Sequence, residues 1–166
     1  TVSRVVEGKG FKRKILIFID ILTINPSPKW IIVGQGDYED ELRRMIKELS
    51  LEEQVFLVGY VNRRELSLYY SLADIFWLLS EFEESFGLVY LEAQCFGLYT
   101  IGNDKGGVKE AISAASGALV NTDSDVLNLI KRERFRCTES SEFNRFIGRL
   151  MSVSIYDYLY SIRAAG

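Results

Sequence analysis

The sequence predicts an α/β domain in which helices cover both faces of a doubly wound parallel sheet. Apolar segments of about five residues alternate with longer amphipathic segments, which is the pattern of successive β-α-β units. Most of the apolar segments lead into a loop that contains glycine, as tight turns require. The 166 residues are 48% hydrophobic and 26% charged, which suits one globular domain with its own core.

The hydrophobic pattern predicts the elements in order. The amphipathic segment 9–22 is expected to be a helix that ends before Asn25-Pro26, because a residue before proline disfavours helical backbone. The apolar runs that follow predict short buried strands, each succeeded by a helix. The expected strands are 1–5, 29–34, 54–59, 74–79, 99–103 and 117–120, and the expected helices are 9–22, 39–50, 63–73, 85–96, 106–115, 124–135 and much of 140–165.

The composition excludes several classes of function. The chain has no histidine, which removes histidine-dependent triads and histidine-ligated zinc from its own chemistry. Cys95 and Cys137 have no neighbouring cysteine or histidine, so we expect neither a disulfide framework nor a metal site. The net charge of −3 argues against a nucleic-acid partner, and no apolar run is long enough to span a bilayer. Because the chain begins at Thr1 without Met, we expect it to be part of a longer protein.

Ligands of such sheets bind beyond the carboxyl ends of the strands, so the loops there hold the candidate site. The Gly-Gln-Gly motif at 34–36 resembles the start of a dinucleotide fingerprint, but Glu39 stands where a third small residue is needed. The Gly-Lys-Gly motif at 8–10 also lacks its third glycine. An NAD or ATP site of the usual kind is therefore disfavoured, and these glycines can equally make ordinary strand-to-helix turns.

Two cations, Arg4 and Lys9, flank the first strand-to-helix turn. Positive side chains close to a helix N-terminus are well suited to bind a diphosphate. A solvated surface position is an equally good reading of these two residues taken alone.

The stretch 80–97, SEFEESFGLVYLEAQCFG, contains four glutamates where a strand gives way to a helix. Ser85 is expected to cap this helix, with Glu84 just before it and Glu92 about two turns inside. Eight residues at about 100° each would leave Glu84 and Glu92 roughly 80° apart around the helix axis, so both could face one cleft. The alternative for Glu84 is that it simply complements the helix dipole.

Glu92 is less easily explained as a solvated side chain, because its neighbours from Leu88 to Ala93 are nearly all apolar. A carboxylate in such a helix should have a fixed partner, and the two hydroxyls of a ribose would suit it. The backbone N–H groups of Gly87, Leu88 and Val89 at the start of the helix could bind phosphate oxygens.

With these motifs the sequence resembles the C-terminal, nucleotide-sugar-binding domain of the retaining GT-B glycosyltransferases of family 4, known as glycosyl transferases group 1. The resemblance extends over about 1–130 and rests on several elements in register. The matching elements are SRVVEGKG, VGQGDYEDEL, VFLVGYV, LYYSLADIFWLLS, ESFGLVYLEAQCFG with its two glutamates separated by seven residues, and GGVKEAI. Such a domain has a Rossmann-like sheet and forms one half of a GT-B fold.

The resemblance implies a role for each matched position. Arg4 and Lys9 would neutralise the donor diphosphate, Glu84 would bind hydroxyls of the donor sugar, and Glu92 would bind the ribose. These implied catalytic residues are Glu84, Arg4 and Lys9. The implied donor-binding residues are Glu92, Phe86, Gly87, Leu88, Val89, Gly59, Tyr60, Val61 and Gly34, with Gly59 to Val61 beside the base. The family needs neither a metal ion nor another cofactor.

The resemblance also implies a function: transfer of a hexose from a UDP- or GDP-sugar to a hydroxyl acceptor in glycan or glycolipid biosynthesis. Lipopolysaccharide is one of the products that such enzymes build. Residues 1–135 would form the donor domain, and the helices of 136–166 would pack on it or cross towards an N-terminal domain that binds a saccharide or lipid-linked acceptor. The fragment alone is then expected to bind donor but transfer little. We expect a cytoplasmic location, with peripheral contact at the inner face of the membrane left open.

The sequence leaves three alternatives open. The domain could bind a nucleotide sugar without transferring it, it could be an epimerase of related fold, or it could be a Rossmann oxidoreductase, which the missing glycines disfavour. Departures from the family pattern, such as Leu79 and Tyr99 in place of common prolines, concern backbone shape more than chemistry.

Overall fold

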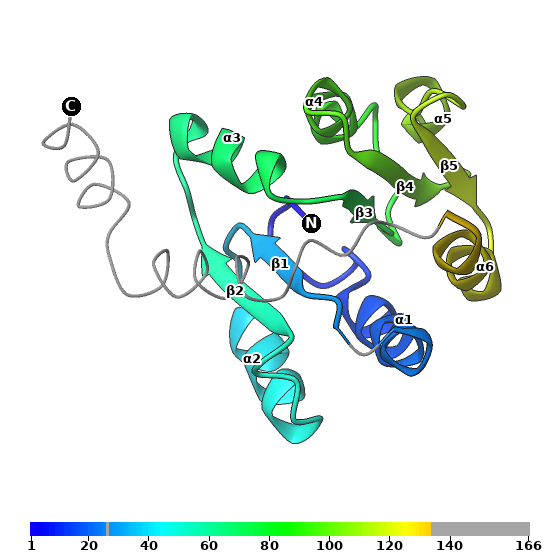
Figure 1. Cartoon of the computed structure of the whole chain (residues 1–166). Helices are drawn as coiled ribbons and strands as arrows, with labels where there is room; N and C mark the ends of the chain where they lie inside the picture. The colour runs from blue at the N-terminus through cyan, green and yellow to red at the C-terminus, as the bar shows by residue number, and fades with distance from the viewer. Residues whose placement is uncertain (26, 134–166) are drawn as a thin grey trace, which may run out of the picture. The chain divides into compact units, whose positions relative to one another are not determined.

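The computed structural model describes residues 1–25 and 27–133, which belong to one compact unit (Figure 1). Its helices are α1 (Phe11–Ile24), α2 (Glu39–Glu48), α3 (Arg63–Ser71), α4 (Leu88–Cys95), α5 (Val108–Ala111) and α6 (Asp123–Glu133). Its strands are β1 (Trp30–Val33), β2 (Val55–Gly59), β3 (Ile75–Leu78), β4 (Tyr99–Asn103) and β5 (Gly117–Val120). The helices expected within 136–166 lie outside the described residues, and the domain boundary at 135 stays a prediction.

All the strands pair in parallel, as predicted. β1 pairs with β2, while β4 lies between β3 and β5 in a second sheet. The segment 1–5 was expected to be a strand, but it forms only an isolated parallel bridge between Val2 and Val33. This segment contacts both sheets, because Ser3 donates its N–H to the Val33 carbonyl at 3.1 Å and the Thr1 hydroxyl donates to the Trp77 carbonyl at 2.8 Å.

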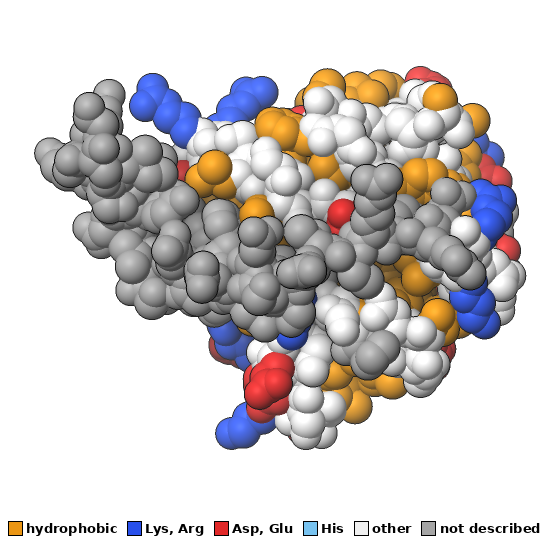
Figure 2. Space-filling model, in the orientation of Figure 1, with side chains coloured by type: hydrophobic (Ala, Val, Ile, Leu, Met, Phe, Trp, Pro, Cys, Tyr) orange, Lys and Arg blue, Asp and Glu red, His pale blue; other side chains and the backbone are white. Residues whose placement is uncertain are grey.

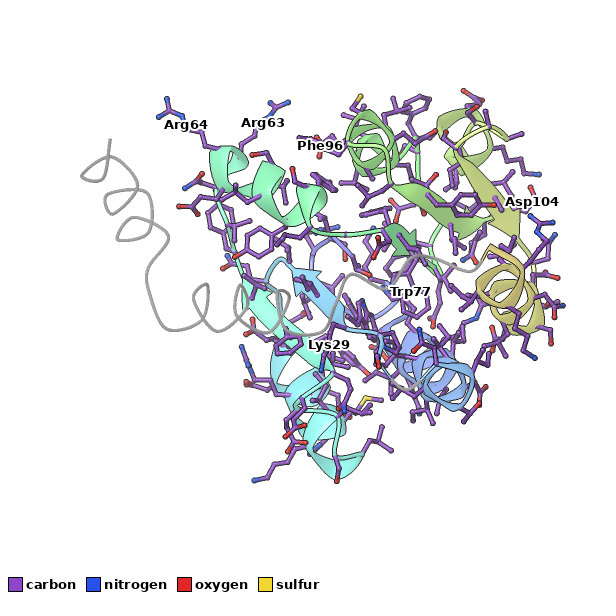
Figure 3. The ribbon with its side chains drawn as sticks, viewed as in Figure 1. Lys29, Arg63, Arg64, Trp77, Phe96 and Asp104 are labelled. Carbon is purple, nitrogen blue, oxygen red and sulfur yellow. The ribbon has the colours of Figure 1, made fainter. Side chains whose placement is uncertain are left out.

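Helices cover both faces of the strands, with α1, α2 and α6 on one side and α3, α4 and α5 on the other (Figure 1). Two hydrophobic clusters fill these layers, one beneath each set of helices. β3 contributes alternately to both: Trp77 packs in the first cluster, and Phe76 and Leu78 pack in the second. The ring of Trp77, labelled in Figure 3, has its centroid 5.0 Å from that of Trp30, and this contact joins β3 to β1. Burial on both faces explains the continuous apolar run of this strand.

Lys14 on α1 is an unusual member of the core. Its side chain is fully buried, and its Nζ has no hydrogen-bond partner in the described part of the chain. The Nζ lies 4.0 Å from the ring centroid of Phe11 and 5.6 Å from that of Trp30, so aromatic faces replace part of its hydration. Burial, with a smaller effect from the charge of Lys9, lowers the pKa of Lys14 from 10.5 to about 7. The ammonium form of this side chain is therefore disfavoured by its surroundings.

No helix in the ranges 1–25 and 27–133 is long and apolar enough to cross a membrane. On the face shown in Figure 2, hydrophobic and charged side chains are interspersed. The large exposed hydrophobic residues come from several elements and include Leu16 on α1, Leu49 after α2, Tyr60 after β2 and Leu88 on α4.

Candidate functional site

The candidate site lies at the carboxyl ends of the strands, where the first turn of the domain meets the loop after β3. Lys9, in the turn that precedes α1, forms an ion pair with Glu84 from that loop. Only 12% of the Lys9 side chain and 18% of the Glu84 side chain are exposed, so solvent screens this pair less than it screens a surface pair. The fold thus brings together two of the three residues expected to be catalytic, although 75 positions separate them in the sequence.

Backbone contacts hold the loop between β3 and α4 from two sides. On one side, the Glu81 N–H donates to the Gly8 carbonyl at 2.7 Å, and the Phe82 ring lies over Gly8. On the other side, the Gly107 N–H donates to the Glu84 carbonyl at 2.9 Å. A Cβ on Gly107 would lie 1.9 Å from the Ser85 carbonyl oxygen, so this position has no room for a side chain. The position of Glu84 therefore depends on two loops that are remote in sequence.

Asn103, at the end of β4, supports the same region and was not singled out from the sequence. Its side chain is buried, and its Nδ2 donates to the Ser80 carbonyl at 2.6 Å. Its Oδ1 accepts a hydrogen bond from Arg13 on α1 at 3.3 Å, and Arg13 also pairs with Asp123 at 2.5 Å. These bonds fix the end of β3 relative to α1 and α6. The sequence did carry a signal for this residue: an asparagine ends a predicted strand, and a buried side-chain amide needs hydrogen-bond partners.

The start of α4 differs from the expectation. Ser85 does not cap the helix: the N-cap is Gly87, with φ 78°, and no side chain caps it. A left-handed residue at this position ends the irregular loop, and glycine adopts that conformation without steric strain. The helix begins at Leu88 and not at Ser85, so helical geometry does not extend back to Glu84, and the angle of 80° between Glu84 and Glu92 is wrong. The amides of Leu88 and Val89 open the helix, where intrahelical partners are lacking.

Glu92 has the fixed partner that its apolar surroundings demanded. The hydroxyl of Tyr70, on α3, donates a hydrogen bond to Glu92 Oε2 at 3.0 Å. Burial raises the pKa of Tyr70, and the charge of Glu92 and this hydrogen bond raise it further, so the hydroxyl stays protonated. Tyr70 was not among the predicted site residues, although the two tyrosines of LYYSLAD before β3 carried the signal.

The other predicted positions lie around the same edge. Gly34 donates its N–H to the Gly59 carbonyl at 2.8 Å, which joins the ends of β1 and β2. Tyr60 follows directly and is 71% exposed, while Val61 and Phe86 are half-buried. Arg4 is exposed and takes part in no ion pair among the described residues, so the structure does not bring it into the Lys9–Glu84 pair.

The described residues contain no group of three or more histidine, cysteine or carboxylate side chains that could hold a metal ion. What the edge does offer is a lysine paired with a partly buried glutamate and the amides of a helix start, with Glu92 in the second turn of that helix. Such a set can bind an anion together with hydroxyl groups.

The sequence profile of the family described as Glycosyl transferases group 1 matches residues 1–132. The chain belongs to this family. The structural neighbours of this glycosyltransferase domain are GT-B glycosyltransferases, which confirms the predicted fold class, a Rossmann-like parallel sheet that forms half of a GT-B fold.

Three similar proteins illustrate the relationship. The chain is 32% identical over 133 residues to a GDP-mannose-dependent monoacylated alpha-(1-6)-phosphatidylinositol monomannoside mannosyltransferase of Corynebacterium glutamicum, covering 76% of this chain and 34% of that protein. It is 28% identical over 131 residues to the alpha-monoglucosyldiacylglycerol synthase of Streptococcus pneumoniae, covering 78% and 30%. The pneumococcal O-GlcNAc transferase GtfA, solved in complex with UDP and GlcNAc, superposes with a TM-score of 0.65 at 24% identity, covering 95% and 30%. The chain thus spans about a third of the length of these curated relatives.

Proposed function

We propose that this glycosyltransferase domain binds a UDP- or GDP-hexose and supports its transfer, with retention at the anomeric carbon, to a hydroxyl of a saccharide or lipid-linked acceptor. The observation that carries the proposal is the partly buried ion pair of Lys9 and Glu84 beside the start of α4. A lysine suits the diphosphate of such a donor, and a carboxylate suits the hydroxyls of its sugar.

Glycosyl transfer from such a donor requires stabilisation of the negative charge on the leaving diphosphate. When the bond between the sugar and the diphosphate breaks, negative charge develops on the diphosphate oxygens. Lys9, Arg4 and the amides of Phe86 to Val89 would stabilise that charge without a metal ion, and a single preorganised donor is worth about 3 kcal/mol in comparable sites. Glu84 would orient the sugar, and Glu92 would bind the ribose.

The donor and acceptor classes draw support from the relatives. One relative is named as GDP-mannose-dependent, and two solved neighbours hold UDP with a sugar. The names of the curated relatives mention phosphatidylinositol monomannoside and diacylglycerol, which supports a lipid-linked acceptor. Acceptor binding would fall to a separate N-terminal domain, so the chain itself should bind donor and transfer little. A cytoplasmic location with peripheral contact at the membrane would give the protein access to a lipid-linked acceptor.

Calorimetric titration of the chain with a panel of nucleotides tests the donor assignment. We expect UDP or GDP, and the corresponding sugar nucleotides, to bind and to raise the unfolding temperature, because a ligand that binds only the native state stabilises it. NAD serves as the matched negative control. Binding of NAD without UDP or GDP would support the oxidoreductase alternative and overturn the proposal.

Replacing Gly107 with alanine tests whether the position of Glu84 matters for the donor. The added Cβ would meet the Ser85 carbonyl and push the loop away, so we expect donor affinity to fall by about tenfold or more. Gly97→Ala is the control for a backbone change without a steric clash: a Cβ there meets nothing within 4 Å, but the φ of 79° disfavours alanine, so this variant should lose about 1 kcal/mol of stability and no donor contact. Donor affinity measured by calorimetry should then change little for Gly97→Ala. Equal affinity of both variants would mean that the loop tolerates the displacement.

A further inference from the structure

Tyr70 is a buried tyrosine whose position is fixed on all sides. Only 3% of it is exposed. Its ring stacks on Phe96 with a centroid distance of 5.5 Å and an interplanar angle of 21°, and it lies 6.1 Å from Phe76. Phe96, at the end of α4, lies on the side of that helix that faces α3 (Figure 3). A tyrosine has few rotatable bonds, so this packing leaves its hydroxyl one well-defined location.

That hydroxyl contacts one oxygen of one carboxylate. It donates to Glu92 Oε2 at 3.0 Å, and this bond joins α3 to α4. Because burial and the neighbouring carboxylate both favour the protonated phenol, the hydroxyl acts as a donor and Glu92 as an acceptor. An ionised carboxylate has two oxygens, so a bond to Oε2 leaves Oε1 able to accept from another group.

We propose that Tyr70 is a positioning residue for Glu92: it holds Oε2 so that Oε1 is presented to a hydroxyl of the donor ribose. This inference rests on the proposed function, since it takes Glu92 as the ribose-binding residue. Tyr70 itself lies beneath the surface and contacts no substrate. Its contribution is to remove the rotational freedom that an unsupported glutamate would lose on binding.

The proposal predicts a loss that depends on the ribose hydroxyls. Tyr70→Phe keeps the ring packing and deletes only the hydroxyl. We expect it to weaken binding of the UDP or GDP selected by the panel about three- to tenfold. Binding of the 2′,3′-dideoxy analogue, which offers Glu92 no hydroxyl, should change by less than about twofold. Tyr69→Phe is the matched control: it is the same substitution in the neighbouring buried tyrosine of α3, and it should leave both ligands unaffected.

Calorimetry of four proteins with both ligands makes the test complete: the parent chain, Tyr70→Phe, Glu92→Gln and the double variant. Because Tyr70 acts through Glu92, the double variant should bind no more weakly than Glu92→Gln alone. An equal loss for both ligands would assign Tyr70 a merely structural role, and unchanged affinities would also overturn the inference. If the parent chain binds neither UDP nor GDP, the proposed function fails and the inference with it. If the parent prefers the ribonucleotide and Tyr70→Phe keeps that preference, only the inference fails.

Discussion

Replacing Lys9 with methionine in the full-length protein is expected to lower kcat/KM for glycosyl transfer by about 100- to 1000-fold. Lys9 is a cation expected to bind the diphosphate, and because only 12% of its side chain is exposed, solvent screens its charge poorly. The substitution keeps most of the apolar stem of the side chain and removes its charge and its hydrogen-bond donors. It also leaves Glu84 without its partner, so part of the loss would come from a glutamate that no longer holds its orientation.

Variants of Glu84 separate the loss of the Lys9 charge from the loss of the ion pair between the two residues. Glu84→Gln removes the carboxylate while keeping its volume, and Glu84→Ala removes the side chain. If both residues act on one bound donor, the double variant Lys9→Met/Glu84→Gln will be far less impaired than the product of the single losses. Steady-state kinetics with saturating acceptor provide the measurement.

Two nearby surface residues serve as controls. Lys12 on α1 and Glu83 in the loop before α4 are exposed and have no assigned role. Lys12→Met and Glu83→Gln should each stay within about twofold of the parent. If the domain only binds nucleotide sugars and takes no part in catalysis, Glu84→Ala should leave the activity of the full-length protein unchanged. That result would leave the domain a binding module rather than part of a transferase.

Replacing Lys14 with methionine is expected to stabilise the domain, by about 2–4 kcal/mol at pH 6. The drop in the pKa of Lys14 from 10.5 to about 7 corresponds to a destabilisation on the order of 5 kcal/mol when the side chain is protonated. The faces of Phe11 and Trp30 offset part of this, because a desolvated cation–π contact contributes about 2 kcal/mol. Methionine fills a similar volume without a charge. The unfolding temperature should rise by roughly 5–15 °C.

The stabilisation that Lys14→Met gives relative to the parent should decrease as the pH rises. Below pH 7 the folded and unfolded states both carry the proton on Lys14, so the full penalty applies. Between about pH 7 and 10.5 the unfolded state binds that proton and the folded state does not, so the stability of the parent increases with pH. At pH 9 the difference between parent and variant should be about 3 kcal/mol smaller than at pH 6.

Denaturant unfolding at pH 6 and pH 9 measures both effects, with Lys12→Met as the exposed control on the same helix. In the isolated chain the α-amino group of Thr1 is also buried, and burial followed by the charge of Lys14 lowers its pKa to about 4. Its own pH dependence is present in the parent and in every variant, so comparison at equal pH removes most of it. A Lys14→Met protein that is no more stable than the parent at pH 6 would contradict the prediction. It would show that burial of the Lys14 ammonium does not destabilise the folded state.

Many elements could be predicted because their signals are local. The apolar run of β3 predicts a strand buried on both faces, and α1 ends before Asn25-Pro26 as expected. The cap of α4 was misassigned because serine next to the helix start is a common cap, whereas the left-handed conformation of Gly87 is imposed by the preceding loop. Residues 1–5 have strand-like composition, but they form only one isolated bridge, between Val2 and Val33 of β1.

The sequence by itself determined the alternation of strands and helices, the absence of histidine chemistry and the residue types available at the carboxyl edge of the sheet. Only the tertiary structure decided the partners: Lys9 with Glu84 across 75 positions, and Tyr70 with Glu92 across 22. The physical reason is one of range. Backbone preference and hydrophobic periodicity act over a few neighbouring residues, whereas a contact between two charged or polar side chains depends on how whole layers pack.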